Sequence, residues 1–312
     1  MSSVLILDIV LLATFGLAAL LLAGLVAVAW HAGLSRMRLA SVDLLALRLF
    51  PVAGALVFAV TVVLPAFLSY EPHQDREAAG LLLLILAAFA LLTLGHGIWR
   101  GSRAWAAARS LLKECGPAKR WVVENGHSVQ VIDAAEPIIG VIGGWRPQVV
   151  TTECIISACS RDEFRQVVAH EAAHVSARDN LKLLLLLACP DALAWTTLGA
   201  ALSERWRREA EFAADERATG DDPQKRVELA AALIKVARLL DTGFRARHAL
   251  TMPVALDDVE GRVRQLLAPA PTVSATISRA LALLVLLMPV GALPLYALVH
   301  ELIETLVRSG RY

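Results

Sequence analysis

Long apolar runs constrain the fold of this 312-residue chain more than any other feature. Four runs are each close to the roughly 20 residues that a helix needs to cross a bilayer: residues 4–30, 50–70, 79–99 and about 277–302. Hydrophobic residues make up 57% of the chain and charged residues only 19%, whereas a soluble domain has roughly 25% charged residues. We therefore predict a mainly helical membrane protein with four transmembrane helices, and the lipid bilayer is an expected partner. The net charge of +1 gives no electrostatic basis for binding nucleic acid.

Basic residues between these runs predict how the chain is oriented. Arg36, Arg38 and Arg48 follow the first run, and residues 100–120 after the third run are also basic, whereas residues 71–77 after the second run are mainly acidic. Basic loops tend to remain in the cytoplasm. The first run has no basic segment before it and no small-residue cleavage site, so we expect a retained anchor. The prediction is a multi-pass protein of the cell (inner) membrane with its N-terminus outside.

The predicted soluble part is cytoplasmic and lies between the third and fourth runs. β-branched and alternating apolar residues predict short strands in its first third. A small sheet of this kind suits a peptidase, because an extended substrate can add a strand to an exposed edge. A purely structural sheet fits the sequence equally well. The predicted domains are 1–103, 104–275 and 276–312, and the predicted strands are 127–133, 137–144 and 147–152.

The motif His170-Glu171-Ala172-Ala173-His174 lies within a predicted amphipathic helix. Residues 160–163, Ser-Arg-Asp-Glu, have the capping-box pattern that starts such a helix. His170 and His174 are one helical turn apart, so both imidazoles can face a single zinc ion. Glu171 is rotated by about 100° and can accept a proton from water beside that ion. This is the arrangement of a zinc metallopeptidase; the alternative is a core helix whose two histidines are structural.

A catalytic zinc usually has three protein ligands, which requires one more donor here. The predicted helix at residues 202–219 carries Glu211 and Asp215, four residues apart and therefore on one face. We predict that Glu211 is the third ligand and that Asp215 orients one of the two histidines through its other ring nitrogen. Glu209 is the competing ligand, although it faces roughly the other side of the helix. A solvated acidic face is the structural alternative.

An apolar segment, residues 181–202, separates the histidines from Glu211. A single membrane crossing would place His174 and Glu211 on opposite sides of the bilayer, where they could not share an ion. Two crossings need about 40 residues, which is more than this part of the chain contains. We therefore predict a bent pair of apolar helices, packed in the core or lying at the membrane surface.

Together, residues 170–174, 178–180 (Arg-Asp-Asn) and 211–215 (Glu-Phe-Ala-Ala-Asp) resemble the membrane-embedded gluzincin peptidases. The three apolar runs before the motif, the one after it and residues 137–147 are similar to the BlaR/MecR-type antibiotic-sensor transducers. The second choice is the HtpX/Ste24-type proteases, because residues 211–215 lack the cysteine often found before the aspartate in sensor peptidases. The transducers carry an extracellular sensor domain after their last span, whereas this sequence stops at Tyr312. Antibiotic sensing is therefore not expected.

The resemblance implies an α+β zincin domain with one catalytic Zn²⁺ ion. It implies that Asp179 supports the zinc ligands and that Arg262 has a structural or substrate-side role. We expect an endopeptidase in which Glu171 transfers a proton from water to the leaving amine. Arg262, His248 or a backbone N–H would stabilise the oxyanion.

The expected substrate is a cytoplasmic or membrane protein or peptide, cleaved in regulated proteolysis or signalling. Quality control of membrane proteins is the alternative among protease functions. A non-catalytic zinc-binding membrane signalling scaffold is the alternative from another class. A structural zinc site of this kind is closed, with protein ligands in every position, and it does not require a glutamate such as Glu171.

Overall fold

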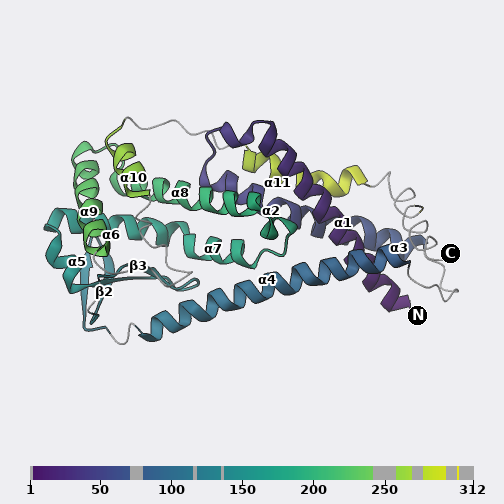
Figure 1. Cartoon of the computed structure of the whole chain (residues 1–312), viewed down its shortest axis with the longest axis horizontal. Helices are drawn as coiled ribbons and strands as arrows, with labels where there is room; N and C mark the ends of the chain where they lie inside the picture. Colours follow the sequence, from purple (N-terminus) through teal and green to yellow (C-terminus); the bar gives the residue numbers. More distant parts are fainter. Residues whose placement is uncertain are drawn as a thin grey trace. The chain divides into compact units, whose positions relative to one another are not determined.

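The computed structural model is mainly helical, with one small sheet (Figure 1). The residues that it describes are 3–70, 80–114, 118–134, 137–241, 258–268, 277–292 and 301. They fall into two compact units. The first unit is drawn from Met1–Trp99, Ala188–Glu204 and Ser274–Tyr312, and the second from Arg100–Leu187 and Arg205–Val273.

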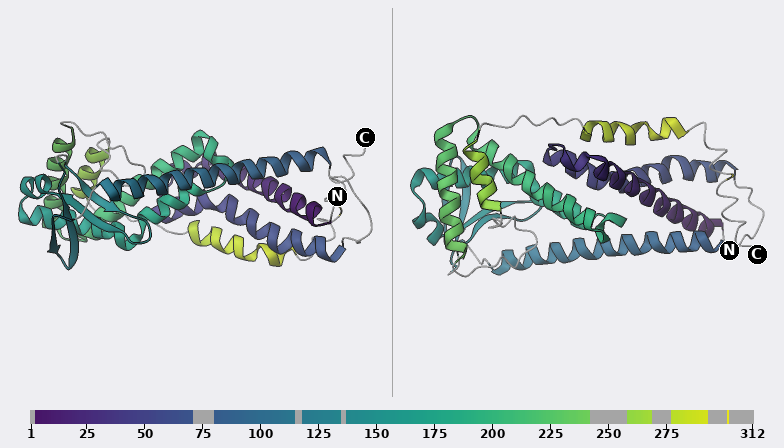
Figure 2. Two further views of the ribbon diagram at one scale, coloured as in Figure 1. Left: turned by 90° about the horizontal axis from the view of Figure 1, so that it is seen from below. Right: turned by 45° about the horizontal axis from the view of Figure 1, so that its top comes forward.

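Among the described residues, three helices are long and apolar enough to cross a membrane, and they confirm three of the predicted spans as helices of spanning length. The third is a single helix that continues beyond the predicted span through residues 100–114, and both views in Figure 2 show it uninterrupted. The three apolar stretches are Leu5–Ala32 in α1 (Ser3–Ala32), Ser41–Ser69 in α2 (Ser41–Phe58) and α3 (Leu64–Tyr70), and Leu81–Leu111 in α4 (Leu81–Glu114).

The second of these helices begins earlier than predicted, at Ser41 rather than at residue 50. The Asp43 carboxylate accepts a hydrogen bond from the Ala40 N–H at 3.3 Å, which satisfies a donor at the helix start. Further along, Pro65 would clash with the carbonyl four residues before it in a regular α-helix. The chain widens into a π-helical turn, Ala59–Val63, just before this proline. The helix therefore continues through a sequence that contains both a buried acid and a proline.

The prediction that Arg48 lies in a connecting loop is wrong. This residue lies within α2 with only 1% of its surface exposed, and its Nη1 donates a hydrogen bond to the buried carboxylate of Asp191. Asp191 also accepts from the Ala194 N–H at 2.7 Å and from the Cys189 thiol at 3.0 Å. A buried charge needs hydrogen-bonding partners of opposite charge or polarity. The partner of Arg48, Asp191, is far from it in the sequence. The predicted membrane orientation therefore rests on the other basic residues.

We expect the substitutions Arg48→Met and Asp191→Leu each to lower the free energy of unfolding by about 3–5 kcal/mol, because each leaves one buried charge without its partner. The double variant should lose clearly less than the sum of the two single variants. Thermal unfolding of the purified protein in one detergent measures all four stabilities. Strictly additive losses would contradict the buried ion pair.

The apolar segment between the predicted zinc ligands is helical and bent, as the sequence predicted. The bend falls at Pro190 and Asp191, and residues 188–204 belong to the same compact unit as α1 to α3. A Cβ atom on Gly97 of α4 would lie 2.5 Å from the carbonyl oxygen of Ala188, so only glycine allows this close contact. The elements are α7 (Asp179–Ala188), the 3₁₀ turn η3 (Ala192–Trp195) and α8 (Thr197–Thr219).

The predicted fourth span, residues 277–302, lies partly outside the described residues. Its described part is the apolar helix α11 (Ile277–Ala292). The Ser278 N–H at its start donates to Asp43 at 2.8 Å. A fourth membrane crossing therefore remains a prediction.

The sheet of the second unit has the strand order β1-β2-β4-β3. The β2–β4 pair is parallel, and the other two pairs are antiparallel. The three predicted strands are confirmed, and one more precedes them, joined by a tight turn in which Asn125 and Gly126 both have positive φ. The strands are β1 (Arg120–Glu124), β2 (His127–Ile132), β3 (Ile139–Ile142) and β4 (Gln148–Thr152).

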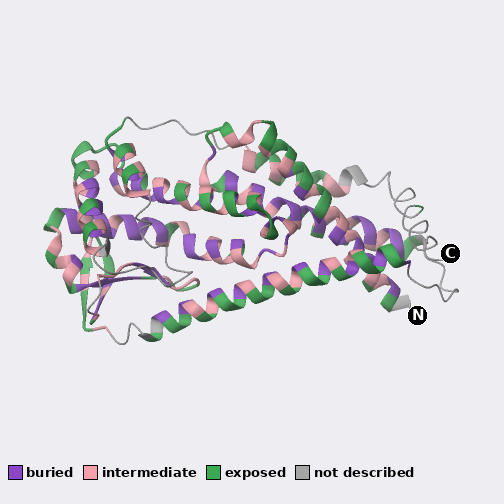
Figure 3. Cartoon of the chain, in the orientation of Figure 1, coloured by how far each residue is buried: buried purple, intermediate pink, exposed green. Residues whose placement is uncertain are grey.

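Apolar contacts on both faces of the sheet hold it against helices. On one face, Val141 and neighbouring valines pack on Phe164 and Val168 of α6 (Arg161–Ala177). On the other face, Ile142 and Val150 pack on Leu111 of α4. Buried residues, purple in Figure 3, recur along α6. This packing fixes α6, which carries the histidine motif, beside the edge strand β3.

Three further helices belong to the described part of the second unit. α9 (Pro223–Asp241) packs on α6, where Lys235 forms an ion pair of 2.6 Å with Glu163. α10 (Val259–Leu266) packs on α9 through Leu229, Leu233 and Leu266. Through this contact α10 brings Arg262 into the interior, with 2% of its surface exposed. A short helix, α5 (Glu153–Ala158), connects the sheet to α6.

Candidate metal centre

The helix that carries the histidine motif begins with the predicted capping box. The Glu163 N–H donates to the Ser160 hydroxyl at 3.2 Å, and the Ser160 N–H donates to the Glu163 carboxylate at 2.6 Å. The helix ends at Arg178, whose left-handed conformation (φ 55°) turns the chain into α7. The buried face between these ends contains His170, Glu171 and His174.

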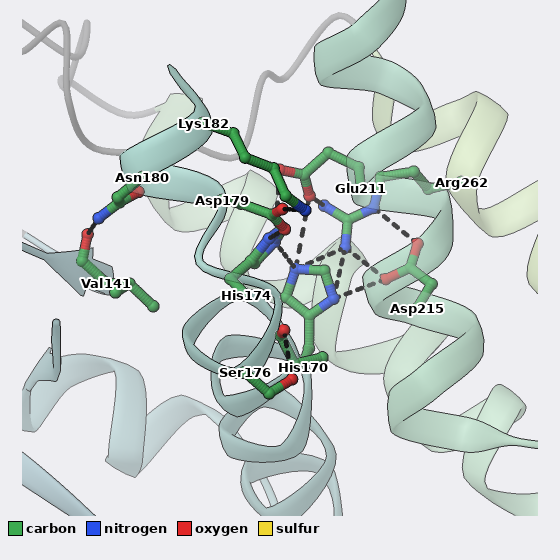
Figure 4. Close-up of polar contacts among 11 residues, drawn as sticks. Val141, His170, His174, Ser176, Asp179, Asn180, Lys182, Glu211, Asp215 and Arg262 are labelled. Carbon is green, nitrogen blue, oxygen red and sulfur yellow. Dashed lines mark hydrogen bonds and ion pairs between the residues drawn. The ribbon is translucent and has the colours of Figure 1, made fainter. Parts of the chain in front are cut away.

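The two histidines direct their Nε2 atoms toward each other and toward Glu211, as Figure 4 shows. The two Nε2 atoms are 3.1 Å apart. The Glu211 carboxylate, from α8, lies 3.4 Å from Nε2 of His170 and 3.6 Å from Nε2 of His174. One donor atom from each of the three residues lies within 4.8 Å of the other two, and all three side chains are buried. The predicted third acid therefore meets the histidine pair and could hold a metal ion with it.

Aspartates hold the opposite ring nitrogens of both histidines. Asp215 Oδ1 lies 2.8 Å from Nδ1 of His170, and Asp179 Oδ2 lies 2.9 Å from Nδ1 of His174. The sequence left open which histidine Asp215 would reach, and the structure pairs it with His170. When the carboxylate accepts a hydrogen bond from Nδ1–H, the lone pair of Nε2 is free to bind a metal ion. Metal-binding histidines are usually supported in this way.

Arg262 lies behind the acids of this cluster. Its Nη1 is 2.8 Å from Glu211 Oε2, and its Nη2 and Nε are 2.6 Å and 2.8 Å from the two oxygens of Asp215. Because these donors already bind carboxylates, the contacts favour a structural role over an oxyanion role. His248, the other predicted oxyanion donor, lies outside the described residues.

Buried charges shift the pKa values of the whole cluster. Burial raises the pKa of Glu171, and the neighbouring histidines only partly oppose this. Burial also disfavours ionised Glu211, but Arg262 and the two histidines outweigh it and hold the pKa of Glu211 well below its usual range. For His174, burial is outweighed by hydrogen bonds to Asp179 and Glu211, which raise its pKa to about 10 in the absence of a metal. Glu211 is thus held as an anion, whereas Glu171 is the acid of the cluster that binds a proton most readily.

Two residues near the site were not predicted from the sequence. The Asn180 amide donates to the carbonyl oxygens of Val141 at 2.9 Å and Gly143 at 3.0 Å, and so ties the start of α7 to the end of β3. Lys182 forms an ion pair of 2.9 Å with Asp179. The Lys182 contact has a sequence signal, the three-residue spacing of a helical pair. The Asn180 contacts have none, because the strand lies far away in the sequence.

Comparison with protein families gives independent support for a metallopeptidase in this part of the chain. Residues 138–281 match the model of peptidase family M48. The M48 match extends from the start of β3 to the first residues of α11 and includes His170, His174 and Glu211. It supports a membrane-associated zincin metallopeptidase of the HtpX/Ste24/BlaR type. No curated protein and no solved structure matched the chain.

Proposed function

We propose that this chain is an integral-membrane zinc endopeptidase that cleaves protein substrates, with His170, His174 and Glu211 as the zinc ligands. The observation that carries the proposal is the convergence of two imidazole nitrogens and one carboxylate in the M48 segment, together with the aspartate behind each histidine. Two nitrogens and one oxygen match the donor set of a catalytic zinc site, which has three protein ligands and one open position. Zinc held there would lower the pKa of a water molecule and polarise a substrate carbonyl.

Glu171 is our candidate for the general base. It follows His170 directly in α6 and is buried, and its raised pKa favours a group that accepts a proton and releases it again. We infer that Glu171 takes a proton from the attacking water and transfers it to the leaving amine. Asp215 and Asp179 hold His170 and His174 in place, and Arg262 keeps Glu211 and Asp215 ionised.

The position of β3 supports an extended peptide as the substrate. β3 is an edge strand of the described sheet, and its Val141 packs on the helix that carries Glu171. An extended chain could pair with this edge and lie close to the metal ligands. We propose a peptidase domain at residues 104–275 on the cytoplasmic face of the cell (inner) membrane, with one zinc ion and a role in regulated proteolysis of the BlaR/MecR type.

The test is proteolysis by the purified full chain in detergent or nanodiscs. We expect casein to be cleaved, the cleavage to stop when a zinc chelator is added, and to return when zinc is restored. Protein that binds zinc but cleaves neither casein nor itself would contradict the proposal and favour a non-catalytic scaffold. Cleavage that persists after complete removal of zinc would also contradict it.

A further inference from the structure

The helix α4 provides a scale for depth in the membrane. A hydrocarbon core of about 30 Å corresponds to about 20 helical residues at about 1.5 Å each. Counted from Leu81, this length ends near Trp99 and Arg100, residue types that favour the membrane interface. Trp105 then lies about 7 Å further along the helix. This is the level of the lipid headgroups, which extend about 5–7 Å beyond each side of the core.

The loop between β3 and β4 lies beside α4 at this level. Ile142, at the end of β3, packs on Leu111. Two residues later, a Cβ atom on Gly144 would lie 3.6 Å from the Trp105 ring. The chain therefore runs along α4 from Leu111 to Trp105. Gly143, with φ of +98°, allows the sharp turn that returns the chain into β4.

The tip of this loop exposes an aromatic ring and a basic group. Trp145 is 71% exposed, more than any other tryptophan in the described part of the chain, and Arg146 beside it is also exposed. Arg103 and Arg109 are exposed on the neighbouring stretch of α4. An indole ring that is exposed to water gains no stabilisation from burial. At a membrane interface, its apolar ring can contact lipid while its N–H forms hydrogen bonds. Of these arginines, Arg146 and Arg103 lie at a similar depth and suit the phosphate groups of lipids.

We propose that the loop at residues 143–147 is a lipid-contacting element. The Trp145 ring lies in the headgroup layer, and Arg146 faces lipid phosphates. The continuity of α4 with a membrane span favours lipid as the occupant over a soluble protein. One consequence is that the loop after β3 would tie this edge strand of the sheet to the bilayer surface.

The test uses tryptophan fluorescence in nanodiscs made with either ordinary or brominated phosphatidylcholine, because bromine quenches only indoles that touch lipid. Wild type, Trp145→Phe and Trp121→Phe are compared in both. Trp121 is a matched control because it is also exposed, at 55%, but lies on β1 at the opposite edge of the sheet. The contribution of Trp145 is the fluorescence of the wild type minus that of Trp145→Phe. We expect this contribution to lose most of its intensity in brominated lipid. The contribution of Trp121 should be equal in both lipids.

An equal Trp145 contribution in both lipids would overturn the proposal and indicate that the loop faces water or another protein. If Trp145→Phe is poorly folded, Trp145→Tyr gives the same difference measurement and keeps an interfacial side chain. Neither measurement depends on proteolysis, so a failed peptidase assay and a failed loop proposal are distinguishable.

Discussion

Replacing Glu171 with glutamine is expected to abolish proteolysis and leave zinc binding unchanged. Glutamine keeps the size and polarity of the side chain but cannot accept a proton from water. General acid–base catalysis contributes about 10²–10⁴-fold to such reactions, so kcat should fall by about this factor. The metal ligands in our account are His170, His174 and Glu211, which the substitution does not change. Initial rates on a peptide substrate and metal analysis of the same preparation measure both effects.

Glu216→Gln is the matched control, because Glu216 is also a helical glutamate but is exposed on α8. We expect this variant to keep both its zinc and its activity. Proteolysis by Glu171→Gln at the wild-type rate would remove Glu171 from the mechanism. Loss of zinc from Glu171→Gln would instead assign it a metal-binding or structural role.

Replacing His174 with alanine is expected to remove zinc, whereas replacing Asp179 with asparagine should only weaken its binding. The alanine variant loses a donor atom of the site. The asparagine variant keeps the imidazole but loses the carboxylate that lies 2.9 Å from its Nδ1. Loss of such a supporting carboxylate typically weakens metal binding by about 10–100-fold. Competition with a chelator of known affinity measures both variants.

Asp162→Asn serves as the control for this series, because Asp162 is an exposed acid in the first turn of the same helix. It should bind zinc as the wild type does. The account would be contradicted if His174→Ala bound zinc with wild-type affinity. It would also be contradicted if Asp179→Asn and Asp162→Asn behaved alike, because Asp179 would then have no special relation to the metal.

The parts of the site that depend on local sequence were predictable. The capping box at Ser160 starts α6, and helical spacing then places both histidines on one face. The same spacing places Glu211 and Asp215 together on α8. These relations are set within one or two helical turns, so a reader of the sequence has all the information that they require.

The remaining features depend on contacts between distant segments. The pairing of Asp215 with His170, and of Arg262 with both acids, requires the packing of three helices. Arg48 is the clearest example, because a lone arginine near an apolar run ordinarily indicates a loop at the membrane surface. Only the position of Asp191 in the fold makes a buried arginine possible at that point.

The most direct test of the central claim is X-ray absorption at the zinc edge of the purified wild-type protein. Our account predicts one zinc per chain, surrounded only by nitrogen and oxygen donors, with the scattering pattern of two imidazoles. In the Glu211→Ala variant, an oxygen donor should be lost or the metal should be absent. A sulfur donor in the wild-type spectrum, or zinc without imidazole scattering, would contradict the assignment of His170, His174 and Glu211.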